Sequence, residues 1–240
     1  MKHSEREHLK TNEVAVALER LTGVQGQSIL RIVGIALVVV VAIGAFVAWR
    51  GAAKAKAEGL LAEALRVESA QVVPPPAPGQ PAAPAGSFQT EQARRDAALG
   101  KFLAVAEAYP SSDAGITARF KAGALLAEQG KRSEALAAFQ AVAAQGGSSI
   151  HARMAALAVA ELQLAAGQHE AAIAAFRELS TRKDTDLPAD GVLMQLGRAY
   201  RMAGKKAEAL QTFTRVTEEF PQSIYVGEAR READALKASM

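Results

Sequence analysis

Phenylalanine recurs at a fixed interval in the C-terminal part of this chain, and that interval restricts the folds available to it. Phe102, Phe139, Phe176 and Phe213 follow one another at steps of 37 residues. An alanine lies four residues before each of them, and a glycine lies nine residues before each of the last three. A period of about 20 to 50 residues is typical of solenoids, propellers and other stacked repeats. The alanines are Ala98, Ala135, Ala172 and Ala209, and the glycines are Gly130, Gly167 and Gly204.

Each unit reads as a helix, a glycine turn and a second helix. Glycine after the first helix supplies the left-handed conformation that ends a helix. The small alanine five residues later lets two helices approach closely, and the phenylalanine after it lies on the same helix face. Pro110 and Pro221, each eight residues after a phenylalanine, end the second helix in the outermost copies. The pattern therefore predicts packed pairs of helices.

Composition agrees with an all-α fold and excludes several kinds of site. The chain has 54 alanines in 240 residues and only 5% aromatic residues, which favours helices over a β-sandwich or barrel. The absence of cysteine excludes disulfides, iron–sulfur clusters and thiolate zinc sites. A net charge of +3 is too small to indicate a nucleic-acid partner. The four histidines have no second ligand at metal spacing, and no phosphate loop, nucleophile elbow or dinucleotide motif is present. We therefore expect no metal, no cofactor and no enzyme activity.

The units resemble the tetratricopeptide repeat, and the third unit fits it best. That resemblance implies an all-α solenoid of about three full repeats, with a partial repeat before them and a capping helix over 222–239. The unit of 37 residues exceeds the usual length of about 34, which implies longer loops between units, as over 181–188. The third unit carries Leu193, Leu196, Gly197, Tyr200, Gly204, Ala209, Phe213 and Pro221 at the signature positions. The first two units keep the glycine, alanine and phenylalanine of each signature, namely Gly130, Ala135, Phe139, Gly167, Ala172 and Phe176.

One segment near the N-terminus predicts a membrane helix. Ile32–Trp49 is 18 residues long without a charge, and as a helix it spans about 27 Å, close to the hydrocarbon thickness of a bilayer. A buried core helix rarely needs large aliphatic residues on every side. A cleaved signal peptide is the stronger alternative, since small residues follow at 53, 55 and 57, but its apolar run is normally about 7–15 residues. We expect a retained helix over 29–50 that contacts the lipid bilayer through Ile32–Trp49.

The remaining segments give the expected layout of the chain. Residues 1–28 form a tail with a short amphipathic helix over 13–21, and residues 51–70 continue the membrane helix as a stalk or as the first helix of the domain. Six of the nine prolines lie within 74–84, so 71–87 is expected to be an extended loop. Residues 88–240 form the solenoid. Because Phe102 belongs to a second helix without a first one, the stalk helix is its natural partner.

The whole layout is similar to a narrower group, the bacterial single-pass proteins related to the ancillary SecYEG translocon subunit. Charge alone leaves the orientation open: two basic residues precede the apolar run within twenty residues and four follow it, but the whole tail carries five. The resemblance implies a cytoplasmic N-terminus, a helix in the bacterial inner membrane and a periplasmic solenoid. The implied protein partners are a translocon component, a chaperone, an exported chain or an envelope-complex subunit.

In tetratricopeptide arrays the first helix of each repeat lines a concave groove. The resemblance therefore implies candidate binding residues on the first helices of this chain. The lysines and asparagines with which some members clamp a carboxylate are absent from these positions. The positions predict instead an apolar strip with basic residues at one end, which suits an amphipathic helix or an unfolded segment. The candidate groove residues are Phe120, Leu157, Glu161, Leu164, Met194, Arg198, Arg201 and Met202.

These features predict a membrane-anchored, non-enzymatic protein-interaction module. One alternative is a structural scaffold, either a homo-oligomer or a fixed subunit of a membrane complex. Another is the regulatory subunit of an enzyme. The sequence leaves all three open, and for any single groove residue, packing between units is as good an explanation as partner binding.

Overall fold

The computed structural model describes residues 24–75, 83–145, 149–181 and 187–239. The amphipathic helix expected over 13–21 lies outside these residues. The regular secondary structure of the described residues is helical, apart from one isolated β-bridge between Val72 and Phe88. The chain divides into two compact units, Met1–Ala55 and Lys56–Met240. Helix α2 (Val24–Glu68), the first one that the structure describes, contributes residues to both compact units.

Helix α2 runs without interruption for 45 residues. It includes an 18-residue window that is apolar enough to cross a membrane, and no residue of that window is buried in the protein. The large aliphatic side chains along it are exposed, as Ile32 and Val38 illustrate. By length and composition this helix meets the requirement for a membrane anchor, as does a signal sequence near an N-terminus.

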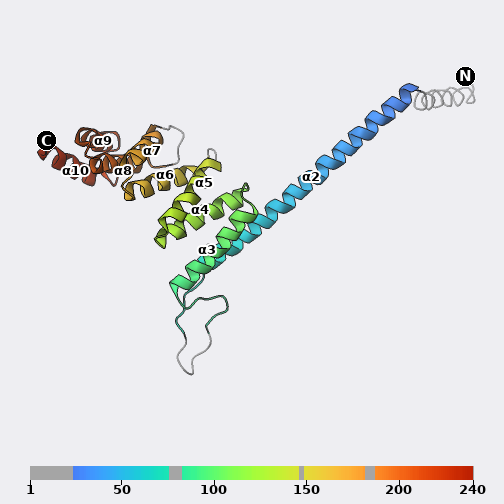
Figure 1. The fold of residues 1–240 in the computed structure, drawn as a ribbon, viewed down its shortest axis with the longest axis horizontal. Coiled ribbons are helices and arrows are strands. Elements are labelled where there is room, and N and C mark those ends of the chain that lie inside the picture. The colour runs from blue at the N-terminus through green and yellow to red at the C-terminus, as the bar shows by residue number, and fades with distance from the viewer. Residues whose placement is uncertain (1–23, 76–82, 146–148, 182–186, 240) are drawn as a thin grey trace, which may run out of the picture. The chain divides into compact units, whose positions relative to one another are not determined.

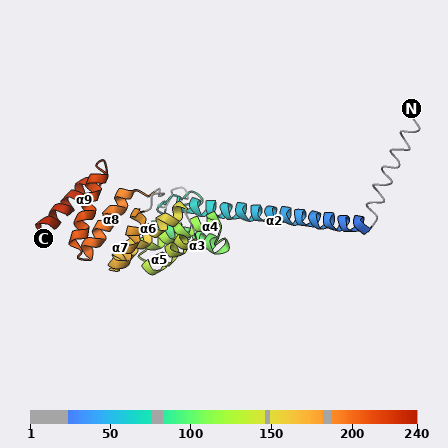
Figure 2. The same ribbon diagram turned by 90° about the horizontal axis from the view of Figure 1, so that it is seen from above.

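The second unit is an α-solenoid (Figures 1 and 2), which confirms the expected fold class. Each helix from α3 onward packs against the next one along the chain, and α6 also contacts α4 and α8. Three full repeats are the pairs α4–α5, α6–α7 and α8–α9, and α10 caps the end. The bounds are α3 Glu91–Ala108, α4 Asp113–Glu128, α5 Arg132–Gln145, α6 Ile150–Ala165, α7 His169–Thr181, α8 Ala189–Met202, α9 Lys206–Glu219 and α10 Val226–Ala238.

The three glycine turns have the conformation that the sequence requires. Gly130, Gly167 and Gly204 have φ angles of 75°, 76° and 76°, in the left-handed region. The residue after each glycine donates its backbone N–H to a carbonyl five residues earlier, at 2.9 Å in all three turns. This is the Schellman arrangement, which satisfies carbonyl groups left open at the end of a helix. The same turn therefore closes the first helix of every full repeat.

The repeated phenylalanines fill the space between paired helices. Phe102, Phe176 and Phe213 are fully buried, and Phe139 nearly so. The alanines four residues before them are all fully buried as well. Opposite Phe139 and Phe213 the first helix carries glycine. A side-chain carbon at Gly123 would lie 3.0 Å from Cε1 of Phe139. The small residue and the large ring are thus complementary sides of one close contact.

The end of α2 supplies the missing first helix of the partial repeat. Ala64 is fully buried in the core shared by α3, α4 and α5. Lys101 Nζ on α3 lies 2.6 Å from Glu63 Oε1, and Lys121 Nζ on α4 lies 3.0 Å from Glu68 Oε2. The end of α2 therefore belongs to the same core cluster as Phe102. This explains why the partial repeat has no helix directly before α3 in the sequence: its first helix is the end of α2, on the other side of the proline-rich segment.

An isolated β-bridge between Val72 and Phe88 joins the two ends of the proline-rich segment. Val73 donates its backbone N–H to the Phe88 carbonyl at 2.8 Å, and Phe88 donates to the Gln71 carbonyl at 2.9 Å. Arg94 Nη1 also donates to the Ala70 carbonyl, at 3.3 Å. These bonds bring the two ends of the segment together at the start of α3. In the part that the structure describes, 71–75 and 83–88 contain no helix, as the prolines require.

Each repeat has 37 residues instead of the usual number of about 34, and the extra residues lie in helices as well as in connections. Helices α4 and α6 have 16 residues, whereas α8 has 14. The first two units therefore use the extra length to lengthen the first helix. A long connection, as expected over 181–188, occurs between α7 and α8. In α4 and α6 a capping serine, Ser112 or Ser149, precedes the first helical residue and accepts a backbone hydrogen bond from the first turn.

Candidate partner-binding surface

The first helices of the repeats lie side by side and form a surface that we call the first-helix wall. It consists of the outward side of α2 from residue 56, α4, α6, α8 and α10. Polar pairs link neighbouring members: Glu68 with Lys121 joins α2 to α4, and Gln195 Nε2 donates to Glu161 Oε1 at 3.2 Å between α8 and α6. The groove residues expected from the resemblance all lie on these helices.

Helices α4 and α6 carry an apolar patch on this wall. Its side chains are half-buried, and all pack against the core around Ala118 and Phe139. Met154 on α6, 41% exposed, adds a flexible apolar side chain at the same helix. A partly exposed apolar surface between two helices is a common site for a partner's apolar side chains. The apolar patch consists of Phe120, Ala124, Ala127, Ala158 and Leu162.

Phe120 is the largest side chain of the apolar patch, and other rings hold it in place. Its centroid lies 5.4 Å from that of Phe139 and 5.6 Å from that of His151, the latter edge-on. Such ring pairs add about 0.5–1.5 kcal/mol beyond the burial of area. The side chain therefore presents a fixed half-exposed face rather than a mobile one.

Two of the expected groove residues belong to the core instead. Met194 is 1% exposed and packs among the residues that join α6, α8 and α9. Leu164 is 9% exposed in the same cluster. Neither leaves surface for a partner, so their assignment to the groove is corrected. Leu157 is half-buried against this cluster and a smaller one around Leu187, so only part of it faces outward.

The expected basic end of the groove is already neutralised by the protein. Arg198 Nη2 lies 2.5 Å from Glu228 Oε1, and Arg201 Nη1 lies 3.3 Å from Glu232 Oε2. Both carboxylates come from the capping helix α10. Met202, 50% exposed, is the remaining apolar residue at this end. The two arginines therefore join α8 to α10 rather than offering free charge to a ligand.

A chain of hydrogen bonds crosses the wall from α6 to α10. Gln195 donates to Glu161, Arg198 Nη1 donates to Gln195 Oε1 at 3.2 Å, and Arg198 also pairs with Glu228. Loss of surrounding water raises the pKa of Glu161, and the hydrogen bond from Gln195 lowers it in part. The wall thus has an apolar half on α4 and α6, and a polar half in which the charges satisfy one another.

Gln195, Glu228 and Glu232 were not among the predicted groove residues, although the repeat period could have identified them. Glu232 lies 37 residues after Gln195, and Glu228 lies 37 residues after Gly191. Continuing the period past Pro221 would have identified α10 as one more first helix. Its carboxylates would then have been placed beside Arg198.

The repeat-defining residues have the structural roles expected of them. Tyr200 is half-buried against the core around Phe213, and Gly197 is buried under that ring. Pro221 follows the end of α9 by two residues. Among the described residues, no group of three or more histidine, aspartate or glutamate side chains is arranged to hold a metal ion.

Comparison with known proteins supports this description. Residues 192–223 match the family model described as tetratricopeptide repeat. No curated protein matches the sequence significantly.

Two solved structures have the same fold. A tetratricopeptide repeat protein from Parabacteroides merdae is similar at 17% identity and a TM-score of 0.52, over 62% of this chain and 56% of that one. A structure of nearly identical tetratricopeptide-like repeats from Podosopora anserina is similar at 12% identity and a TM-score of 0.51, over 78% of this chain and 97% of that one. The chain therefore contains a tetratricopeptide repeat, and its compact unit Lys56–Met240 folds as a tetratricopeptide-like α-solenoid.

Proposed function

We propose that this chain is a membrane-anchored, non-enzymatic interaction module that holds a segment of a partner protein against its first-helix wall. The apolar patch on α4 and α6 carries the proposal. It is a half-exposed apolar surface on a repeat fold whose stacked helices present extended walls, and it lies beside polar groups that already satisfy one another. An amphipathic helix or an unfolded segment has the chemistry that matches this surface.

The charges on the wall indicate what kind of segment fits. Because Arg198 and Arg201 are paired with Glu228 and Glu232, they do not select for an acidic partner. Lys121 is likewise paired with Glu68 at the other side of the apolar patch. The partner's apolar side chains therefore supply most of the affinity, and its polar side chains encounter both signs of charge. We expect binding to change little with salt.

The proposed location is the bacterial inner membrane, with residues 29–50 spanning it once and the solenoid in the periplasm. The uncharged run Ile32–Trp49 and the similarity in layout to the ancillary translocon subunit group support this. On this assignment the partner is a translocon component, a chaperone, an exported chain or an envelope-complex subunit. A Ser239→Cys variant tests the topology, because the chain has no other cysteine. Labelling of intact cells by a thiol reagent that enters only the periplasm is expected. Protection until the inner membrane is opened would contradict it.

Photo-crosslinking tests the wall itself. A photoreactive amino acid at Ala165, an exposed position on α6, should capture a partner in intact membranes. Met154→Glu places a charge beside the apolar patch and should abolish most of that capture. Leu103→Glu is the matched control, because Leu103 is 38% exposed on the second helix α3. Capture that survives Met154→Glu in a folded protein would contradict the proposal. If both variants still capture the same partner at a constant stoichiometry, the result would favour the alternative in which the chain is a structural scaffold.

A further inference from the structure

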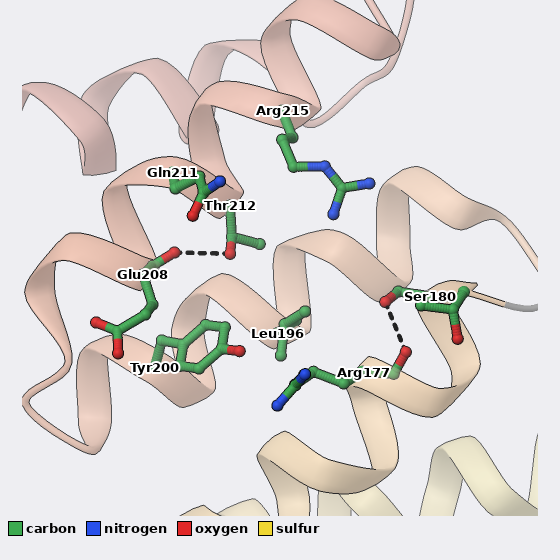
Figure 3. A pocket seen from close by; sticks show the side chains of 9 residues that line it. Arg177, Ser180, Leu196, Tyr200, Glu208, Gln211, Thr212 and Arg215 are labelled. Atoms are coloured by element: carbon green, nitrogen blue, oxygen red, sulfur yellow. Dashed lines mark hydrogen bonds between the residues drawn. The ribbon is translucent and has the colours of Figure 1, made fainter.

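A small pocket lies on the other side of the last two repeats, between the second helices α7 and α9 with α8 as its floor. Its volume is about 180 Å³, the space of roughly six water molecules, or one side chain of similar size. The floor is formed by Leu196 and the ring of Tyr200, which lie four residues apart on α8. Arg177 of α7 and Arg215 of α9 also line it (Figure 3). This pocket is separate from the first-helix wall.

The two arginines bring more hydrogen-bond donors to the pocket than the described residues use. Arg215 gives Nε and Nη2 to Glu219, at 2.7 and 3.2 Å, which leaves Nη1 outside that pair. Within the described residues, no hydrogen bond or ion pair engages the guanidinium of Arg177 or the hydroxyl of Tyr200. Figure 3 shows Leu196 in the view between the two guanidinium groups. The pocket is therefore an apolar floor flanked by cationic donors.

The acidic residue of the pocket lies toward its other end. Glu208 precedes Arg215 by seven residues on α9, a distance of about 10 Å along the helix axis. The hydrogen bond from Lys205 to Glu170 is the main cause of the raised pKa of Lys205, and the nearby charge of Glu208 raises it further. The lining is thus polarised, with its positive charge at the Arg177 and Arg215 end.

We propose that this pocket binds the carboxylate side chain of a glutamate or aspartate from a peptide segment. The carboxylate takes charge-assisted hydrogen bonds from Arg177 and from Nη1 of Arg215, while the methylene carbons of the ligand rest on Leu196 and Tyr200. Since none of the described residues pairs with the Arg177 guanidinium, and Glu219 half-neutralises Arg215, the site matches a single negative charge better than the two charges of a phosphate. Its walls leave room for one side chain.

Fluorescence anisotropy on the full chain in nanodiscs of phosphatidylcholine tests the proposal. The probe is a labelled twelve-residue peptide of alanine, leucine and glutamate, and the comparator has glutamine at every glutamate position. Both are amidated at the C-terminus, so only side-chain carboxylates differ. The glutamate peptide should bind at least tenfold more tightly than the glutamine peptide. Equal affinities, or no binding at millimolar concentration, would overturn the proposal.

Variants separate a defined site from general attraction. Arg177→Gln combined with Arg215→Gln should weaken binding of the glutamate peptide at least tenfold. Arg132→Gln, the same change at an exposed arginine of α5 outside the pocket, should leave the Kd within twofold. Gln211→Trp fills the rim of the pocket without changing charge and should also abolish binding. Unchanged binding in Gln211→Trp, or an equal loss in Arg132→Gln, would show that no pocket is involved. Crosslinking at Ala165 should be unaffected by all four changes, so this proposal and the wall proposal fail separately.

Discussion

The ring of Phe213 occupies the space where a side chain at Gly197 would stand, since a Cβ there would lie 2.5 Å from Cε1 of the ring. We therefore expect Gly197→Ala to force α8 and α9 apart. Overpacking of this kind costs about 1–3 kcal/mol. Urea denaturation followed by circular dichroism measures the loss in the free energy of unfolding.

Gly100 provides the matched control for that substitution. It lies in the middle of α3, and a Cβ there meets nothing within 4 Å. Gly100→Ala should stabilise the protein by about 0.5–1 kcal/mol, because alanine loses less chain entropy in a helix. The same chemical change thus has opposite signs at the two positions. If Gly197→Ala is neutral or stabilising, the close contact with Phe213 is not what holds this pair together.

A charge at Ala64 should disrupt the partial repeat. Ala64 is fully buried against the core of α3 and α4, whereas Ala62, two residues earlier on the same helix, is exposed. Ala64→Glu buries an unpaired carboxylate and should cost about 3 kcal/mol or more, while Ala62→Glu should change stability by less than about 0.5 kcal/mol. Hydrogen exchange should show loss of amide protection in α3 for the first variant alone. Equal protection in both would mean that α2 is not part of the solenoid.

Two carboxylates should give the solenoid opposite pH responses. Burial raises the pKa of Glu161 above its unfolded value, so the stability this group adds is present at low pH and lost as pH rises through the folded pKa. The hydrogen bond from Lys101 lowers the pKa of Glu63, so its contribution is present at neutral pH and lost on acidification. Glu161→Gln should therefore raise the unfolding midpoint at pH 7, and Glu63→Gln should lower it. Midpoints that move in the same direction at pH 7 would contradict this.

The pairing between α8 and α10 is accessible to a double-mutant cycle. Arg198 and Glu228 are each about one third exposed, so their coupling should be about 0.5–1 kcal/mol rather than the larger value of a buried pair. The cycle combines Arg198→Gln with Glu228→Gln and compares the sum of the single changes with the double one. Additive effects would show that the arginine is free to bind a partner after all.

Sequence reasoning reached the fold because a few residues determine each unit. The left-handed turn at Gly204 and the ring of Phe213 restrict the local geometry so strongly that their spacing alone predicts paired helices. The partial repeat was also predictable, since a second helix with Phe102 needs a first helix from somewhere. The position of the extra residues was not, because a serine cap such as Ser149 lengthens a helix as readily as a loop absorbs the same residues.

The candidate groove was only partly predictable for a geometric reason. Repeat position says which side of a helix a residue occupies, but not what the neighbouring unit places over it. Met194 lies at the same position as Phe120, yet the first is buried and the second is half-exposed. Arg198 reads as a free charge in the sequence, whereas in the structure α10 supplies Glu228 as its partner. Contacts between units are set by pairs of residues far apart in sequence, and no single unit contains that information.

The constant spacing of the glycine and phenylalanine contacts also restricts how such a chain can change in length. A deletion of one residue in the part of α9 before Phe213 would rotate everything after it by about 100°, and would turn this ring away from Gly197. Removal of a complete block of 37 residues keeps every remaining ring opposite its small partner. Evolution and protein engineering alike can therefore shorten or extend this solenoid by whole blocks without losing these ring contacts, although the charge pairs at the two ends, such as that of Arg198 with Glu228, would have to be rebuilt.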